Sequence, residues 1–231
     1  MNIRFLIFSL LVYCNIYSQN PENNKVISVM LLDCYEGSEM DDRKTDLTDY
    51  WAVYEKERYS TTNFDIKKHN SESIERPRFL INGLNYRNSF STNGRWINRK
   101  MYPGEAITFS VPNVENERKS RSYSIYIKGK IIETENNQFP YFEEIRDYEL
   151  RVATEGFNES LAKIDIKTFA SGGTGGGIYL YWIGDLNGDN RLDMLVGTSN
   201  HFAGIELTLY LSDKSDNKLF IKHKVGSCSS C

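Results

Sequence analysis

Apolar and polar residues alternate along most of the chain, as in strands with one face in a core and the other in solvent. The clearest run is Ser122–Ile132, where Tyr123, Ile125 and Ile127 share one face. Ile145–Val152 repeats this alternation. The other expected strands are Val26–Leu32, Tyr50–Tyr54, Phe64–Lys67, Arg78–Ile81, Ala106–Val111, Ala162–Phe169, Ile178–Ile183, Met194–Val196, Ile205–Leu211 and Leu219–Val225.

Helical signals are few. Asp46–Glu57 has apolar residues at a 3–4 spacing and can be drawn as a helix, although its Trp, Val and Tyr content favours a strand. Asn158–Lys163 can form one or two helical turns. Strands that recur at intervals of about ten to twenty residues predict an all-β fold, either an antiparallel sandwich or a barrel-like sheet.

The first 18 residues have the pattern of a signal peptide. A short segment with Arg4 precedes an apolar run from Phe5 to Val12, which is shorter than the about 20 residues that span a bilayer. Cleavage after Ser18 fits best, and lipidation of Cys14 or a buried N-terminal strand are the alternatives. We therefore expect an exported protein, periplasmic or extracellular, with no later transmembrane segment.

The rest of the chain has the length of one large β domain or two small ones. We expect an N-terminal β portion over 19–76 and a main β domain over 77–231, with the boundary in polar Asn70–Arg76. The predicted cleavage removes one cation and no acid, so the formal net charge of −3 becomes −4. This mild acidity argues against nucleic acid or an anionic membrane as a partner.

Three cysteines remain after the predicted cleavage: Cys34, Cys228 and Cys231. In an oxidising compartment cysteines pair where geometry allows, and an odd number leaves one over. The preferred bridge joins Cys34 to Cys228 or Cys231, with Cys228–Cys231 as the alternative. The Cys-Ser-Ser-Cys spacing opens no helix, which disfavours a redox motif.

An acidic loop follows the apolar run Ile178–Ile183. Over residues 185–193 the sequence reads Asp-Leu-Asn-Gly-Asp-Asn-Arg-Leu-Asp, with oxygen-bearing side chains at Asp185, Asn187, Asp189 and Asp193. Arg191, at the seventh position, can offer only its backbone carbonyl. Carboxylates this close repel one another, and Ca²⁺ takes six to eight oxygen ligands, so the spacing predicts a calcium site. An empty polar turn and another metal are the alternatives.

The first nine positions of this loop resemble EF-hand and dockerin loops, but the twelfth position is Val196, where those loops have an acidic ligand. The pattern is more similar to FG-GAP or VCBS-type loops of integrin α-chain propellers, in which two strands flank the metal. The stretch Gly177–Cys231 also resembles the C-terminal part of uncharacterised exported bacterial proteins with a single loop of this kind. The resemblance implies the β fold and calcium, and it implies no activity.

Other candidate sites carry weaker signals. The glycine-rich run Ser171–Gly177 lacks the ending of a P-loop and precedes a strand, so a connector is favoured over a phosphate site. His69, His201 and His223 have no partner at metal-ligand spacing. Ser199, His201 and Asp193 could be drawn as a hydrolase triad, but no nucleophile elbow is present.

Acidic pairs and aromatic residues add no stronger candidate. Adjacent carboxylates such as Glu143-Glu144 and Asp41-Asp42 would point to opposite faces of a strand. Tryptophans 51, 96 and 182 could stack on a sugar, although aromatic residues of β proteins more often lie in the core. We therefore expect a protein with structural calcium that binds a protein or a glycan without catalysis. The alternative is a glycan-directed hydrolase in which calcium stabilises the rim of the active site.

Overall fold

The protein is built almost entirely from β-strands. The computed structural model describes residues 26–32, 47–58, 61–71, 73–112, 120–132, 144–166, 176–200, 204–213 and 218–228, and within them no helix occurs. The expected all-β class is confirmed. The strands are β1 (Ser28–Leu31), β2 (Trp51–Arg58), β3 (Thr61–Lys68), β4 (Phe79–Asn82), β5 (Phe90–Met101), β6 (Ala106–Pro112), β7 (Ser120–Ile132), β8 (Glu144–Thr154), β9 (Phe157–Ile166), β10 (Gly177–Gly184), β11 (Asp193–Ser199), β12 (Ile205–Ser212) and β13 (Phe220–Cys228).

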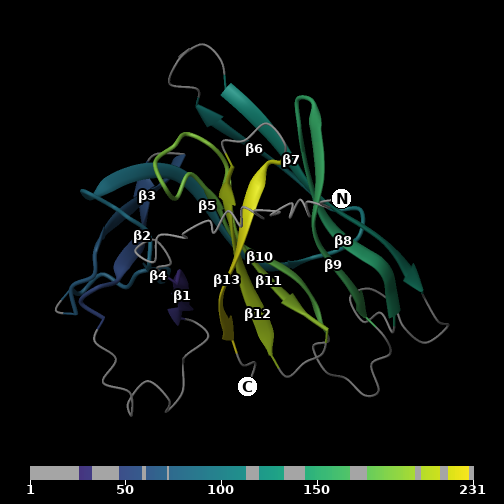
Figure 1. Ribbon diagram of the computed structural model, residues 1–231, viewed down its shortest axis with the longest axis horizontal. Coiled ribbons are helices and arrows are strands. Elements are labelled where there is room, and N and C mark those ends of the chain that lie inside the picture. Colours follow the sequence, from purple (N-terminus) through teal and green to yellow (C-terminus); the bar gives the residue numbers. More distant parts are fainter. Residues whose placement is uncertain are drawn as a thin grey trace, which may run out of the picture.

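Nine strands form one large sheet in the order β1-β4-β2-β3-β5-β10-β11-β12-β13. Each hydrogen-bonded pair in it is antiparallel. The sheet curls until its two edge strands, β1 and β13, lie side by side, which gives a nearly closed barrel-like shape (Figure 1). Its interior is filled by large apolar side chains, among them Phe64, Phe79 and Trp182, which are 0% exposed.

The other four strands form a second antiparallel sheet, β6-β7-β8-β9. Alternate residues of these strands face a second apolar core, which they share with the outward-facing residues of β10 and β11. Ile125, Leu150 and Val152 from this sheet, and Ile178 and Met194 from the large one, are all fully buried. The chain is therefore a barrel-like sheet with a smaller sheet packed on its outer surface.

Two tyrosine hydroxyls join the sheets across this core. The Tyr210 hydroxyl, on β12, donates to the carbonyl of Leu161 on β9 at 2.7 Å. The Tyr148 hydroxyl, on β8, donates to the carbonyl of Met101 and accepts from the amide of Ile178. Burial raises the pKa of both phenols, because an apolar core disfavours the charged form. Both therefore stay neutral and act as fixed cross-braces.

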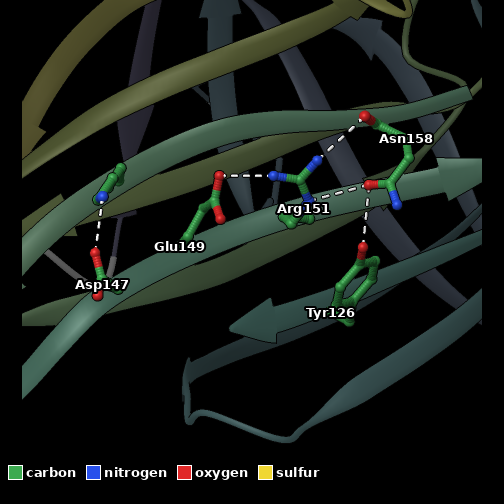
Figure 2. Close-up of polar contacts among 6 residues, drawn as sticks. Tyr126, Asp147, Glu149, Arg151 and Asn158 are labelled. Atoms are coloured by element: carbon green, nitrogen blue, oxygen red, sulfur yellow. Dashed lines mark hydrogen bonds and ion pairs between the residues drawn. The ribbon is translucent and has the colours of Figure 1, made fainter. Parts of the chain in front are cut away.

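The opposite face of the second sheet carries a ladder of polar contacts. Figure 2 shows Tyr126 and Arg151 both donating to Oδ1 of Asn158, at 3.0 Å each, while Arg151 also pairs with Glu149. On the same face Lys163 donates to Asp147 at 2.9 Å. Exposed pairs of this kind contribute little to stability, so this face is a solvated surface.

Two helical alternatives raised by the sequence are wrong. The segment 46–57 is described from Leu47 on, and it contributes β2; Asn158–Lys163 lies within β9. Trp51–Glu57 and most of Asn158–Lys163 have cross-strand partners, and ladder pairing with burial of alternate side chains overrides a weak local helical spacing. The remaining expected strands are present, with ends that differ by a few residues.

Strand β5 had no counterpart among the expected strands. Its inward positions include Thr92 and Gly94, which do not register as an apolar stripe. At Gly94 a side chain has no room, because a Cβ there would lie 2.9 Å from the ring of Phe64 and 3.0 Å from Nε1 of Trp182. The aromatic residues fill the space that this strand leaves, so its place in the sheet depends on its neighbours.

The expected portions 19–76 and 77–231 share one sheet. β2 and β3 come from the first portion, and they pair with β4 and β5 from the second. The polar stretches Asn113–Arg121 and Glu133–Gln138 predict exposed loops. Residues 113–119 and 133–138 lie outside the described residues, as does the expected signal segment, whereas Ser120 and Arg121 belong to β7. None of the described residues belongs to a helix long and apolar enough to cross a bilayer.

Candidate functional site

The acidic loop joins β10 to β11 at one end of the barrel. The two strands form the hairpin expected from the sequence, and Gly184 and Asp193 are their last cross-strand pair before the loop. Leu186 and Leu192 are both 0% exposed and hold the loop on the core. The loop therefore starts and ends on rigid, buried backbone.

Asp193 is the hub of the loop. Its side chain is fully buried, and its Oδ2 atom accepts the amides of Leu186 at 2.7 Å and Asn187 at 3.2 Å. Its Oδ1 atom accepts the amide of Ser212 on β12 at 2.7 Å. One carboxylate thus holds the start of the loop against the neighbouring strand.

Asp185 organises the tip of the loop. Its Oδ1 accepts the amides of Gly188 and Asp189, at 2.8 and 3.0 Å, and its Oδ2 accepts the amide of Asn190 at 2.8 Å. Gly188 and Asn190 have φ values of 76° and 60°, the left-handed conformation that glycine and asparagine tolerate best. The backbone can therefore wrap its amides around the first acidic side chain.

Two further residues support the loop without having been expected as site residues. The Ser212 hydroxyl donates to Oδ2 of Asp189 at 2.7 Å. The Tyr86 hydroxyl donates to the carbonyl of Leu186 at 3.0 Å, and its ring packs against Trp51 with centroids 4.8 Å apart. Both come from distant strands or loops, so only the folded chain brings them to the site.

Arg191 turns away from the acidic side chains. Its Nη1 atom donates to the carbonyl of Asp213 at 2.7 Å, while its backbone amide donates to Oδ1 of Asp189 at 3.0 Å. The guanidinium is therefore engaged outside the acidic loop.

The buried acids of the loop have raised pKa values. The pKa of Asp193 is raised to about 8, chiefly by burial; the charges of Asp189 and Asp185 add to the rise, and hydrogen bonds from backbone amides oppose it. Burial likewise raises the pKa of Asp185, with Asp189 adding to the effect. Negative charge at this loop is therefore incompletely compensated by the protein itself.

The oxygen donors fit a hard cation in kind, but they do not converge as they stand. Within the described part of the chain no three Asp, Glu, His or Cys side chains are grouped as metal ligands. A carboxylate or carboxamide oxygen has two lone pairs. Lone pairs not used by the contacts above remain on the side chains of Asp185, Asn187, Asp189 and Asp193.

A cleft of about 460 Å³ opens beside the loop. The loop forms one wall, the starts of β5 and β3 form another, and the end of β6 closes it from the second sheet. Phe90 and Phe109 line it from opposite sheets, together with Asn63, Asn93 and Asn190. The volume lies within the range of roughly 300–1,000 Å³ that is usual for ligand pockets.

The other sequence candidates do not gather into a site. His201 and residues 171–175 of the glycine-rich run lie outside the described residues, as do Asp41, Asp42 and Glu143, while a polar hollow of about 370 Å³ lies beside Ser199 and Gly204. Asp193 is bound to backbone amides instead of facing a histidine, and Glu144 pairs with Arg146. His69 and His223 are each half-buried on separate strands or turns.

The tryptophans and Cys228 lie in packed parts of the structure. Trp51 and Trp182 are buried in the barrel core, and Trp96 packs against Phe79 and Tyr181, so they form no exposed platform. Cys228 is 6% exposed at the end of β13, which lies beside β1. Cys34 and Cys231 lie outside the described residues, and the disulfide pairing stays a prediction.

Comparisons of the chain with protein families, with curated proteins and with solved structures find no match.

Proposed function

We propose that this is an exported, non-enzymatic binding protein in which the loop Asp185–Asp193 holds a structural calcium ion. The observation that carries the proposal is the burial of Asp193 at 0% exposure beside two further aspartates. A buried carboxylate is costly unless it is paired. The amides satisfy its hydrogen bonds, but no cationic side chain of the loop faces it, since Arg191 is engaged with Asp213.

The chemistry of the loop suits calcium better than other metals. Its side-chain donors are carboxylate and carboxamide oxygens, which calcium and magnesium both accept, without the imidazole or thiolate that zinc and copper favour. Calcium tolerates irregular coordination, whereas Mg²⁺ usually keeps several waters and is seldom held by an all-protein cage. A bound cation would remove the repulsion that now raises the pKa values of Asp185 and Asp193.

A binding role is supported by the clefts rather than by a reactive group. Among the described residues, the cleft of about 460 Å³ is lined by one acid, Asp185. The hollow of about 370 Å³ is also lined by one acid, Glu206. Asp185 already accepts three backbone amides. Glycoside hydrolysis needs two carboxyl groups that flank the scissile bond. The glycan-directed hydrolase is therefore the less supported alternative.

The calcium proposal is tested by calorimetry and by melting of the purified chain with calcium or with EDTA. Calcium at a hundred times its Kd stabilises the folded state by about 2.7 kcal/mol. For a chain of this length that free energy raises the melting temperature by roughly 5–11 °C. Asp189→Asn should weaken calcium binding, because it removes one negative charge from the loop. The fold should persist, because Asp189 is half-buried and its backbone contact is the half-buried amide of Arg191. Asp147→Asn on the second sheet should leave binding unchanged. No calcium heat and identical melting curves would show that the loop is a metal-free staple.

Export is tested separately. The full chain is expressed in a bacterial host, the cell is fractionated, and the N-terminus of the recovered protein is sequenced. A mature protein that begins at Gln19 in the periplasm or medium supports the predicted signal peptide. Recovery of uncleaved chain in the cytoplasm contradicts it.

A further inference from the structure

Three asparagines from three separate segments line the cleft beside the acidic loop. Asn63 on β3 and Asn93 on β5 are directly opposite each other in the ladder, and Asn190 lies in the loop. Directly opposite residues have Cβ atoms about 4.5–5.5 Å apart, so the first two amides lie on the same face. No contact recorded among the described residues engages any of these three side-chain amides.

The side chains of the cleft disfavour anionic ligands. Among the described lining residues Asp185 is the single charged one, and its oxygens accept three backbone amides. No lysine, arginine or histidine lines the cleft in the described part, so a phosphate, sulfate or carboxylate would find no counter-charge. An uncharged ligand fits these surroundings best.

The apolar part of the cleft consists of two phenyl rings. Phe90 is half-buried and lies under Gly188, where an added Cβ would be 3.9 Å from the ring, and Phe109 is 8% exposed on the facing sheet. A sugar ring has C–H faces that pack on aromatic rings and hydroxyls that both donate and accept hydrogen bonds. A carboxamide offers a donor and an acceptor side by side, which matches a pair of hydroxyls.

From these observations we infer that the cleft between the acidic loop, β5 and β6 binds an uncharged sugar unit of a glycan. The inference rests on the proposed binding function and names its ligand class. A peptide added as a strand to the free edge of β6 is less favoured. Pro112 in the cleft wall has no N–H to donate, and the unengaged amides are side chains instead of a backbone ladder.

The test measures binding of the full chain to a panel of neutral oligosaccharides, with sulfated oligosaccharides and an extended-peptide library in parallel. Two variants remove one amide each: Asn93→Ala, and Asn190→Gly, which retains the left-handed backbone. Asn85→Ala, at an exposed position that does not line the cleft, is the matched control. We expect a neutral glycan to bind and each cleft variant to weaken its Kd about tenfold or more, with Asn85→Ala unchanged. Melting temperatures confirm that every variant is folded.

The outcomes separate this inference from the calcium proposal. Binding of a neutral glycan that is lost in the cleft variants, in a protein with no calcium response, supports the inference and overturns the calcium proposal alone. A calcium response with no binding to any neutral glycan overturns the inference alone. Preferential binding of sulfated glycans or peptides, or neutral binding that Asn93→Ala and Asn190→Gly leave unchanged, also overturns the inference.

Discussion

Removing the Asp193 side chain should strongly destabilise the protein. Asp193→Ala deprives the amides of Leu186, Asn187 and Ser212 of their acceptor. Leu186 is fully buried, so its unpartnered amide costs about 1–3 kcal/mol. Asn187 is exposed and Ser212 half-buried, so their amides regain water and each loses about 0.5–1.5 kcal/mol.

These contributions sum to roughly 2–6 kcal/mol of unfolding free energy. Because about 1 kcal/mol shifts the melting temperature of a chain of this size by 2–4 °C, the central value corresponds to a loss of roughly 8–16 °C. Asp193→Asn should fall between Asp193→Ala and the wild type. Its remaining oxygen can serve Leu186 and Asn187, while its amide nitrogen faces the donor of Ser212.

The measurement is thermal and urea unfolding in EDTA at about pH 4, so that calcium is absent and the cost of ionising the buried Asp193 side chain contributes little. Asp147→Asn is the matched control, because its carboxylate is 80% exposed and its φ of 49° is one that asparagine tolerates. The control should melt with the wild type. If Asp193→Ala melts within about 2 °C of the wild type, the amides it leaves behind are not buried and the hub assignment is wrong.

Three further predictions concern pH and the core. In EDTA the folded state binds the Asp193 proton more tightly than the unfolded chain does, because burial raises the pKa of Asp193 to about 8. The free energy of unfolding should therefore fall as pH rises from about 4 through 8. Asp193→Asn, or added calcium, should flatten that fall. Tyr148→Phe should cost about 1–3 kcal/mol in urea unfolding, because it leaves the Met101 carbonyl and the Ile178 amide without a partner, and Tyr210→Phe should cost about 1 kcal/mol. Tyr126→Phe on the solvent face is the control. Equal effects of all three substitutions would contradict the cross-brace role. Gly184→Ala should lower the free energy of unfolding measured by calorimetry by about 1–3 kcal/mol, because its Cβ would lie 2.5 Å from the Trp182 ring and 2.7 Å from the Asn93 carbonyl. A variant as stable as the wild type would mean that this contact relaxes freely.

Local sequence was informative wherever a strand has one apolar face. The alternation in Ser122–Ile132 predicted β7, because its burial follows every second residue over the middle of the strand. The acidic loop was also recognisable from local sequence. Its acidic and amide side chains bond to backbone amides only two to seven residues away, so the spacing of these residues reflects the loop's own structure.

Only the tertiary structure decided the rest. β5 is buried through small residues beside Phe64 and Trp182, so its own sequence lacks an apolar stripe. The joining of the two expected portions in one sheet depends on pairings between strands distant in sequence. Ser212 and Tyr86 reach the loop from distant parts of the chain, and the cleft has walls from both sheets. The sequence by itself thus determined the strands with one apolar face and the acidic loop. Packing determined which surface the loop and the three asparagines share, because that surface exists only after both sheets have assembled.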